Sequence, residues 1–580
     1  MDSNKVWSFV LSLLLIPLVG WAQGLGEKNV EQYGTLQEVE APFLLSTRWN
    51  QSSPFNDDCP PNTAAGCGAI AMAQIMNYYK KPSVGYGQVS YLCANSVTAE
   101  ANFSEYPFDW DNIRDVYDES NTEEERKAVA NLVYLAGAAA KTNYSTSSSA
   151  TWHKMMWGFQ HYLHFSPRSR YHHRRFYSTA EWTEMLCREL EARRPVMYSS
   201  SSTTVNSTSL RAHIYVIDGR DNDGNYHCNY GNYGSNRDQF TSLNYINIRN
   251  STPLGYGSSN YQHSQSMATN LYPEDGLTDD DFDYLPVALS SPIVLEVETQ
   301  SGIIAMRDKV QARFTYSTVF FDNVVRGKLS LGFYLNDELV AHTNEIDLSK
   351  DNTTIHHSVN SSFTLPQDLE DGDYEMSIIS RANGSTIWYR GWSDAPNIIP
   401  VTVRGGFFTF HMPDYHCGET NLCLDGMPQF IDLENQRVIA FTLHNPSTNN
   451  FENELKVCFG DKTQTLLTSI YDGQSVTYQF VVDTSTEIED ICLSYYETNK
   501  KEWISLLDNG ASLDDKSIGS TSRHLSVYSI NGQLLKQFSL PVTQQEYDRV
   551  LNQLPNGLYI LSDQKGVRKY VKRTRNGRNM

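Results

Sequence analysis

The stretch Trp49–Pro82, WNQSSPFNDDCPPNTAAGCGAIAMAQIMNYYKKP, decides how the first half of the chain folds. It opens with turn formers and changes at Gly66–Cys67 to Ala, Ile, Met and Gln, which favour helix. Four apolar residues then recur at i, i+3, i+4 and i+7 and predict one helix face: Met72, Ile75, Met76 and Tyr79. The Cys67 thiol is therefore expected at the first turn of a mostly buried helix, where free N–H groups favour the thiolate.

Length and charge limit the classes of function. The chain has 580 residues, enough for several domains, and a net charge of −21. A surface this acidic leaves no basic face to neutralise phosphates, so no nucleic-acid partner is expected.

The N-terminus has the pattern of a secretory signal. Lys5 precedes an apolar run over 9–19, and Gly20-Trp21-Ala22 supplies small residues at the −3 and −1 positions of a cleavage site. Residues 1–22 are predicted to be a signal peptide and 23–40 a short leader. The apolar run is too short for a transmembrane anchor. The protein is therefore expected to be secreted or held on the outer cell surface.

Residues 41–275 mix helix and strand patterns and form the first predicted domain. A mobile loop is expected over the Ser/Thr-rich stretch 199–209. The expected helices are 123–140, 152–163 and 179–193, and the expected strands are 195–198, 213–217 and 226–230.

An acidic linker over 274–283 separates this domain from a part with an all-β pattern. Apolar and alternating runs between turns predict immunoglobulin-like sandwiches over 285–404 and 405–505, and a small β unit over 521–580. The predicted fold class is thus an α+β domain followed by β-sandwich modules.

The chain has nine cysteines, so at least one thiol does not pair within the chain. Cys417 and Cys423 are close enough in sequence to bridge locally. Cys458 and Cys492 could pair within one sandwich. The pattern alone does not choose between these pairings.

A cysteine nucleophile needs a base, an orienting group and an oxyanion donor. His213 opens an apolar strand and is the best candidate for the base. Asn229 lies on the strand expected to pair with it, from which its side-chain oxygen could reach the imidazole. Gln51 precedes Cys67 in the loop before the helix and is the candidate oxyanion donor.

These segments together resemble the streptopain family of papain-like cysteine peptidases. The residues that carry the resemblance are W-N-Q…P-F-N, G-C-G-A-I-A-M-A-Q-I-M-N-Y-Y-K-K-P, P-V-M-Y…A-H-I-Y-V-I-D-G and Y-H-C-N-Y-G, over about 41–275. The resemblance implies a papain-like fold, hydrolysis of proteins or peptides, and roles for Cys67, His213, Asn229 and Gln51 as nucleophile, base, orienter and oxyanion donor. It also implies that Ser147, Ser148 and Ser149 line the substrate groove.

The chain departs from the family pattern near the base. Asn229 is followed by Tyr230-Gly231-Asn232-Tyr233-Gly234, where the family usually has W-G-W-G-G. Tyr230 is therefore expected to wall the substrate site in place of a tryptophan. Ala212 stands where the family often has Gly and is expected to narrow the entrance. The leader over 23–40 is shorter than the family's inhibitory propeptide.

Two rival functions remain open, and a metal site is not expected. A weak or inactive homologue could serve as a surface-binding protein, and a thiol acyltransferase or amidase could use the same scaffold. A metal site would need Cys59, Cys67, His213 and His227, which lack paired short ligand spacing. No cofactor is predicted.

The last part of the chain resembles the C-terminal sorting domain of the type IX secretion system. The matching residues are HLSVYSIN at 524–531, LPNGLYIL at 554–561 and a basic strand ending at Lys572. The resemblance implies that the type IX machinery is a partner and that residues 521–580 direct transit across the outer membrane.

Overall fold

Helix α1 (Cys67–Tyr79) begins at the predicted residue in the computed structural model, and residues 68–77 of it are buried. Gly66 precedes it with φ of 95°, and a Cβ there would lie 3.2 Å from the Cβ of Ser148. Only glycine fits this conformation and this space without strain. The sequence therefore places Cys67 at the start of a buried helix.

The structure describes residues 43–94, 96–202, 211–232, 239–243, 261–275, 287–296, 303–317, 326–349, 356–393, 396–433, 436–507, 524–529, 534–539, 557–563 and 566–572. These residues belong to one compact unit, Ala41–Met580. The predicted signal peptide and leader lie outside the described residues, as do most of the predicted linker and residues 203–209 of the predicted loop.

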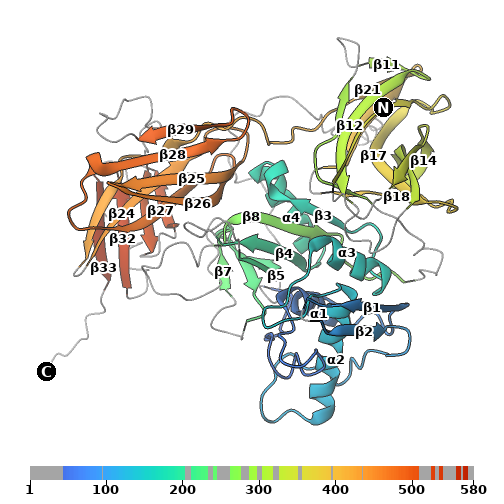
Figure 1. Ribbon diagram of the computed structural model, residues 1–580, viewed down its shortest axis with the longest axis horizontal. Helices are drawn as coiled ribbons and strands as arrows, with labels where there is room; N and C mark the ends of the chain where they lie inside the picture. Colours follow the sequence, from blue (N-terminus) through green and yellow to red (C-terminus); the bar gives the residue numbers. More distant parts are fainter. Residues whose placement is uncertain are drawn as a thin grey trace, which may run out of the picture. The chain divides into compact units, whose positions relative to one another are not determined.

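The first domain is built on a six-stranded sheet with helices on both faces (Figure 1). In spatial order its strands are β3 (Arg170–His173), β8 (His263–Thr269), β4 (Val196–Ser201), β5 (Ala212–Arg220), β6 (Tyr226–Asn229) and β7 (Gln239–Thr241). The other elements are α2 (Glu123–Ala139), α3 (Trp152–His161), α4 (Thr179–Glu191), the 3-10 turn η2 (Arg174–Phe176) and the hairpin β1 (Gln88–Leu92) with β2 (Thr98–Asn102).

Side chains from alternating residues of the sheet pack into two separate cores, one on each face. Ile214 and Val216 pack with α1, α2 and α3 on one face, and Tyr215 and Ile217 pack with α4 on the other. This alternation is what a strand covered on both faces requires. The prediction of an α+β domain is confirmed, and so is the hairpin of β5 and β6.

The predicted mobile loop is wrong at its start. Ser199, Ser200 and Ser201 form the end of β4 and are buried between β5 and β8. Their hydroxyl groups find partners there: Ser199 Oγ accepts a hydrogen bond from Trp152 Nε1 at 2.8 Å. A polar run can therefore form an interior strand when its neighbours satisfy the hydroxyls.

The part after residue 287 is largely sheet and contains two successive two-sheet cores. The first core lies between a five-stranded sheet and an eight-stranded sheet. The five-stranded sheet has β10 (Val294–Glu296), β12 (Lys309–Ser317), β9 (Ala288–Leu289), β19 (Trp392–Ser393) and β16 (His356–Thr364). The eight-stranded sheet has β11 (Ile303–Ala305), β21 (Phe407–Phe410), β20 (Ile399–Arg404), β17 (Gly372–Ala382), β13 (Arg326–Leu335), β14 (Glu338–His342), β15 (Ile346–Ser349) and β18 (Tyr389–Arg390).

The second core, called the second sandwich below, lies between two four-stranded sheets within residues 422–507. One sheet has β22 (Cys423–Leu424), β24 (Gln436–His444), β23 (Gln429–Leu433) and β27 (Ser475–Val482). The other has β26 (Lys462–Ile470), β25 (Phe451–Phe459), β28 (Ile491–Glu497) and β29 (Glu502–Leu507), with the 3-10 turn η5 (Ile488–Asp490) before β28. An immunoglobulin-like topology for the two sandwiches stays a prediction.

One of the two considered disulfides forms. Cys458 and Cys492 face each other across β25 and β28 and are bonded. Neither Cys417 nor Cys423 is in a disulfide, so the local bridge is not made. Cross-strand pairing brings Cys458 and Cys492 together although they are 34 residues apart in sequence.

The C-terminal region contributes one further sheet among its described residues. It is antiparallel, in the order β31 (Leu534–Ser539), β30 (His524–Ser529), β32 (Gly557–Asp563) and β33 (Gly566–Lys572). A small β unit was predicted over 521–580. The assignment to a type IX sorting domain stays a prediction.

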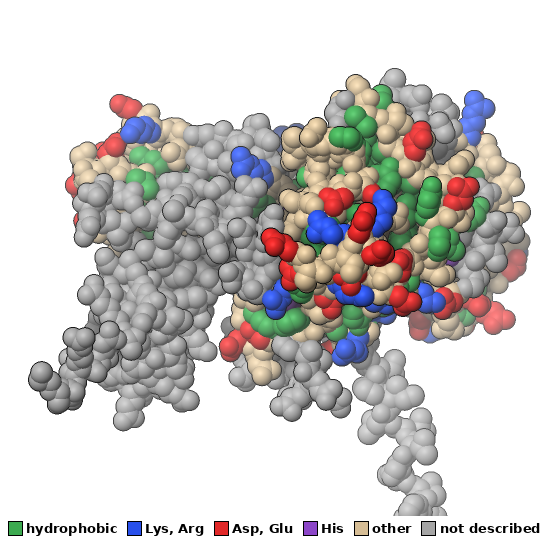
Figure 2. All heavy atoms as spheres, turned by 90° about the horizontal axis from the view of Figure 1, so that it is seen from below, with side chains coloured by type: hydrophobic (Ala, Val, Ile, Leu, Met, Phe, Trp, Pro, Cys, Tyr) green, Lys and Arg blue, Asp and Glu red, His purple; other side chains and the backbone are tan. Residues whose placement is uncertain are grey.

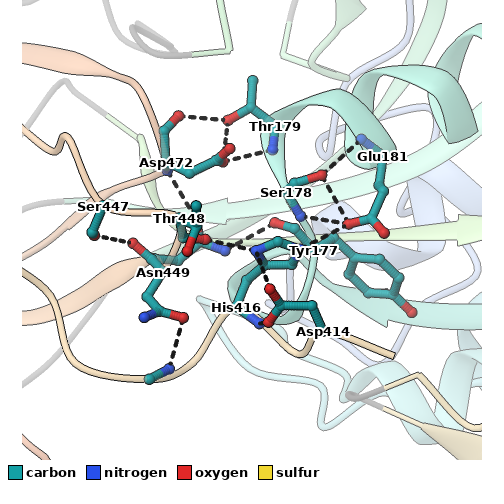
Figure 3. Close-up of polar contacts among 12 residues, drawn as sticks. Tyr177, Ser178, Thr179, Glu181, Asp414, His416, Ser447, Thr448, Asn449 and Asp472 are labelled. Atoms are coloured by element: carbon teal, nitrogen blue, oxygen red, sulfur yellow. Dashed lines mark hydrogen bonds and ion pairs between the residues drawn. The ribbon is translucent and has the colours of Figure 1, made fainter. Parts of the chain in front are cut away.

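The second sandwich is bonded to the start of α4 in the first domain (Figure 3). The Asp472 carboxylate accepts hydrogen bonds from the Thr179 backbone N–H at 2.6 Å and from its hydroxyl at 2.7 Å. His416 Nε2 lies 3.3 Å from the Glu181 carboxylate. Asn450 donates to the carbonyls of Arg175 and Tyr177, each at 2.9 Å. The Asp472 contacts add to the capping box that Ser178 and Glu181 form at the start of α4, and Asn450 satisfies carbonyls of the turn before it.

Charged side chains of both signs are intermixed on the described part of the face drawn in Figure 2. Lys and Arg side chains do not gather into an extended patch there, which agrees with the acidic balance of the chain. Within the described ranges, every helix is too short or too polar to cross a membrane.

Candidate active site

Cys67 and His213 form a hydrogen-bonded pair at the junction of α1 and β5. Burial by itself raises the pKa of the Cys67 thiol, but the hydrogen bond and the charge of His213 lower it more. The backbone N–H groups of Ile214 and Gly68 add to this effect. The pKa of the thiol therefore lies below its ordinary value. The first turn of α1 has no side-chain cap, so its N–H groups also face this region.

The His213 imidazole is buried among three tyrosine rings. The ring centroids of Tyr215, Tyr230 and Tyr261 lie 6.1, 6.5 and 6.4 Å from its own. Its Nε2 lies 2.8 Å from the backbone carbonyl oxygen of Tyr230. A carbonyl can only accept, so Nε2 carries the proton of this bond. The Tyr230 carbonyl thus fixes the orientation of the imidazole.

Asn229 lies on β6 as predicted, but its side chain is bonded elsewhere. Its Nδ2 donates to the Thr47 carbonyl at 2.8 Å, and its Oδ1 accepts from Gln74 Nε2 at 2.9 Å and from the Gly231 N–H at 3.2 Å. The expected hydrogen bond to His213 is therefore replaced by that of the Tyr230 carbonyl. The reason is register: Asn229 pairs with Val216, three residues along β5 from His213.

Gln51 is brought to the site by the loop before α1. Its carbonyl accepts a hydrogen bond from the backbone N–H of Ala65, two residues before Cys67. Its side-chain Nε2 donates to Asn232 Oδ1 at 3.2 Å, and Asn232 Nδ2 lies 3.5 Å from His213 Nε2. The structure therefore brings together Cys67, His213 and Gln51, with Asn232 between the last two.

The three serines expected to line the groove differ in exposure. Ser147 and Ser149 are exposed, whereas Ser148 is buried. Ser148 Oγ donates to the Ala64 carbonyl at 2.6 Å and accepts from the Ser145 N–H at 2.9 Å. Ser148 thus holds the loop that leads into α1, and its hydroxyl is occupied.

Tyr230 and Ala212 were expected to border the substrate. The Tyr230 side chain is 1 % exposed and packs against Tyr215 in the core beneath the sheet. The Tyr230 ring is therefore too deeply buried to border the substrate; it packs beside His213, and its carbonyl bonds the imidazole. Ala212 is exposed at the start of β5, beside His213.

The metal alternative named Cys59, Cys67, His213 and His227 as ligands. Among the described residues, no group of three or more His, Cys, Asp and Glu side chains could hold a metal ion. His227 is bonded to Asp218 at 2.6 Å and stacks on Phe43. This ring is therefore already occupied by other protein groups.

Two groups at the site were missed from the sequence. The Tyr230 carbonyl is a backbone group, which no residue pattern identifies. Asn232 lies in a Gly- and Asn-rich segment that reads as a turn. Asn232 directly follows Gly231, just after the strand that pairs with the His213 strand. That position was the one sequence signal that could have placed Asn232 near His213.

A thiol–imidazole pair with an amide side chain beside it is an arrangement that cysteine hydrolases use. Comparison with known proteins shows which protein family this region is similar to. Residues 49–240 match the model of the Peptidase C10 family. This part of the chain, which contains Cys67, His213 and Gln51, is thus similar to the Peptidase C10 family.

Curated relatives carry matching names. The thiol protease/hemagglutinin PrtT of Porphyromonas gingivalis is 26% identical over 236 residues, which are 39% of this chain and 26% of that protein. Streptopain of Streptococcus pyogenes serotype M28 is 24% identical over 275 residues, 42% of this chain and 66% of that protein. The chain thus spans about a quarter of one relative and just under two thirds of the other.

A solved structure also matches this region. The active wild-type interpain A cysteine protease of Prevotella intermedia has 27% sequence identity and a TM-score of 0.37. The match covers 40% of this chain and 94% of that chain.

Proposed function

We propose that this protein is a cysteine endopeptidase that hydrolyses peptide bonds of extracellular proteins. The observation that carries the proposal is the lowered pKa of the Cys67 thiol, which follows from its hydrogen bond with His213 inside the region similar to the Peptidase C10 family. A thiolate at ordinary pH is the form of cysteine that attacks a carbonyl. The names of the relatives, thiol protease and streptopain, point the same way.

The proposed reaction uses groups already close together. His213 holds the proton of Cys67, and the thiolate attacks the carbonyl carbon of the substrate peptide. Gln51 Nε2 and the Cys67 backbone N–H bind the oxygen as it becomes negative. Imidazolium then gives its proton to the leaving amine, and a thioester to Cys67 remains.

A water molecule completes the reaction. His213, now neutral, takes a proton from the water as it attacks the thioester carbonyl, and the new acid leaves as Cys67 regains its thiolate. Through both steps the Tyr230 carbonyl keeps the Nε2 proton in place, at 2.8 Å. Nδ1 is therefore the ring nitrogen left to exchange a proton with the thiol.

Selective alkylation tests the proposal. Iodoacetamide at about pH 6 should label Cys67 to one equivalent before other thiols react, because few ordinary thiols are ionised there. Cys187 is the internal control, since it is half-buried and burial raises the pKa of its thiol. His213→Ala should remove the fast labelling. If Cys67 labels no faster than Cys187, the peptidase proposal fails and a surface-binding homologue remains.

Casein hydrolysis then separates the enzyme classes. Wild-type protein should release peptides from casein, and Cys67→Ala should not. Added hydroxylamine should not increase turnover of a peptide amide by acyl transfer. If hydroxamate forms faster than free acid at low amine concentration, the thiol acyltransferase alternative replaces the peptidase.

For location, we propose export by the predicted signal peptide and sorting by residues 521–580 through the type IX machinery. The support is the sequence resemblance, together with a four-stranded antiparallel sheet in this region. Deleting residues 521–580 should leave the protein in the periplasm of a host with type IX secretion. Appearance of the shortened protein outside the cell would contradict the sorting role.

A further inference from the structure

Asn232 connects two site residues that come from different parts of the chain. Its Oδ1 accepts a hydrogen bond from Gln51 Nε2 at 3.2 Å, and its Nδ2 lies 3.5 Å from His213 Nε2. Gln51 is on the loop before α1, whereas His213 is on β5. Asn232 is therefore the side chain between the proposed oxyanion donor and the proposed base.

The backbone before Asn232 is tightly specified. Gly231 has φ of 60°, and a Cβ there would lie 2.7 Å from Ile70 Cγ2 on α1. Its N–H donates to Asn229 Oδ1 at 3.2 Å, and Asn229 is itself held by Thr47. A glycine in this conformation and a buried amide thus fix the turn from which Asn232 projects.

The proton on His213 decides how the Asn232 amide can face it. Nε2 donates its proton to the Tyr230 carbonyl at 2.8 Å, so it cannot also accept one from Asn232 Nδ2. A half-turn of the amide exchanges oxygen and NH2 groups of similar size without moving the rest of the side chain. Oδ1 would then share the Nε2 proton with the Tyr230 carbonyl, which gives the imidazolium charge a second acceptor.

We infer that Asn232 is a positioning residue that presents Oδ1 to His213 and Nδ2 to Gln51 in the reactive thiolate–imidazolium state. Gln51 then faces Asn232 with its Oε1, which leaves its Nε2 free to bind the oxyanion. The Asn232 amide thereby orients the base, His213, and positions the oxyanion donor, Gln51 Nε2. The inference rests on the proposed peptidase function and adds this role for Asn232.

Two substitutions separate the two halves of this role. Asn232→Leu removes both the acceptor and the donor at similar volume. Asn232→Asp keeps acceptors for His213 but has no proton to donate to Gln51. Asn112→Leu is the matched control, since Asn112 is also half-buried and its amide bonds Asp109, away from the site.

The readouts are the pH profile of Cys67 alkylation by iodoacetamide and the kcat and KM of peptide hydrolysis. In Asn232→Leu, the acid limb of the pH profile of the alkylation rate should move up by about half to one pH unit. The reason is that the imidazolium loses an acceptor. It should also lower kcat by about 10- to 100-fold, as loss of an aligned oxyanion donor does. Asn112→Leu should change neither quantity.

Asn232→Asp should leave the acid limb at or below its wild-type position and still lower kcat about tenfold, because only the contact with Gln51 is lost. Combining it with Gln51→Ala should lower kcat no further than Gln51→Ala alone. Additive losses in kcat would overturn the coupling between Asn232 and Gln51.

The inference can fail while the peptidase proposal stands. Wild-type reactivity at Cys67 with an unshifted acid limb and unchanged kcat in Asn232→Leu would overturn it. A change in KM alone would make Asn232 a substrate contact instead. Losses that disappear when the assay is run well below a lowered Tm would assign a purely structural role. Absence of fast Cys67 labelling in the wild type would reject the peptidase itself.

Discussion

His213 and His173 lie on the same six-stranded sheet and each faces an acidic group, but burial affects the two pairs in opposite ways. At the active site, the pKa of Cys67 is lowered, because the hydrogen bond and charge of His213 outweigh burial. Where β3 meets the second sandwich, His173 Nε2 lies 3.5 Å from the Glu452 carboxylate. Burial there raises the pKa of Glu452 to about 7 and lowers the pKa of His173 to about 3.

The difference lies in the other partners of each pair. The thiolate of Cys67 receives backbone N–H groups, and the far nitrogen of His213 has a carbonyl acceptor. His173 instead accepts from the Arg175 N–H at its Nδ1 and faces the positive side chain of Arg175 and the ring of His263, which disfavour its charge. Burial keeps a pair neutral unless hydrogen bonds stabilise the charge of both members.

His416 supports this rule from the same interface. Burial alone would lower its pKa, but the hydrogen bonds to the Glu181 carboxylate and the Thr448 carbonyl raise the pKa to about 9. Its Nδ1 lies 2.6 Å from that carbonyl and its Nε2 3.3 Å from the carboxylate. An acceptor on each nitrogen therefore favours the charged imidazole. Figure 3 shows His416 among these partners.

Breaking the charged pair should have the largest effect. His213→Ala removes the group that holds the Cys67 proton, so kcat for peptide hydrolysis should fall by about 10³-fold or more. The rate of Cys67 alkylation near pH 6 should fall with it. His172→Ala is the control, because His172 is buried on β3 and bonded to Tyr177, not to the site. Retained fast alkylation in His213→Ala would show that burial and α1 alone activate the thiol.

Replacing Glu452, the neutral acid of the second pair, should show more clearly how it differs from the charged Cys67–His213 pair. Glu452 keeps its proton in the folded protein to about pH 7, against 4.5 when unfolded. Its contribution to stability is thus present below pH 4.5 and is lost as the pH rises toward 7. Glu452→Gln imitates the protonated acid. It should match the wild type at acid pH and exceed it by up to about 3 kcal/mol in unfolding free energy at about pH 8.

Urea unfolding at several pH values measures this difference. Glu502→Gln, at an exposed position on β29, should change stability little at any of them. A Glu452→Gln variant that is less stable than the wild type at about pH 8 would mean that Glu452 is charged at the interface, as Cys67 is at the site.

Removing a neutral interface donor should have a smaller effect. Asn450 Nδ2 donates to two carbonyls of the first domain, and its Oδ1 accepts from the Asp472 N–H at 3.0 Å. Asn450→Ala leaves these groups without a partner and should cost about 1–3 kcal/mol in unfolding free energy. The shift should not depend on pH, unlike that of Glu452→Gln. A shift that follows the titration of Glu452 would mean that the two sites are coupled.

The smallest effect is expected at the start of α4. Thr179→Val removes the hydroxyl that donates to Asp472 but keeps the backbone hydrogen bond and the volume. The cost should be about 1 kcal/mol in unfolding free energy. Thr498→Val, at an exposed hydroxyl on the second sandwich, is the control. Equal shifts in both variants would mean that the Asp472 contact adds nothing to docking.

Much of the fold followed from local pattern. The expected helices at 123–140, 152–163 and 179–193 end within two residues of α2, α3 and α4, because caps and apolar spacing are local signals. The serine run of β4 was misjudged because its hydroxyls are satisfied by residues far away in the chain, such as Trp152. Disulfide pairing has the same limit: Cys417 and Cys423 are close in sequence but form no disulfide, because pairing depends on the tertiary structure.

The sequence by itself determined that Cys67 starts a buried helix, that His213 opens a strand, and that these lie in an α+β domain. Helix spacing, Gly66 and strand alternation are properties of neighbouring residues. Only the tertiary structure decided that the carbonyl of Tyr230, not the amide of Asn229, orients His213, and that Asn232 joins it to Gln51. Register between β5 and β6 sets these contacts, and register depends on how whole strands pair.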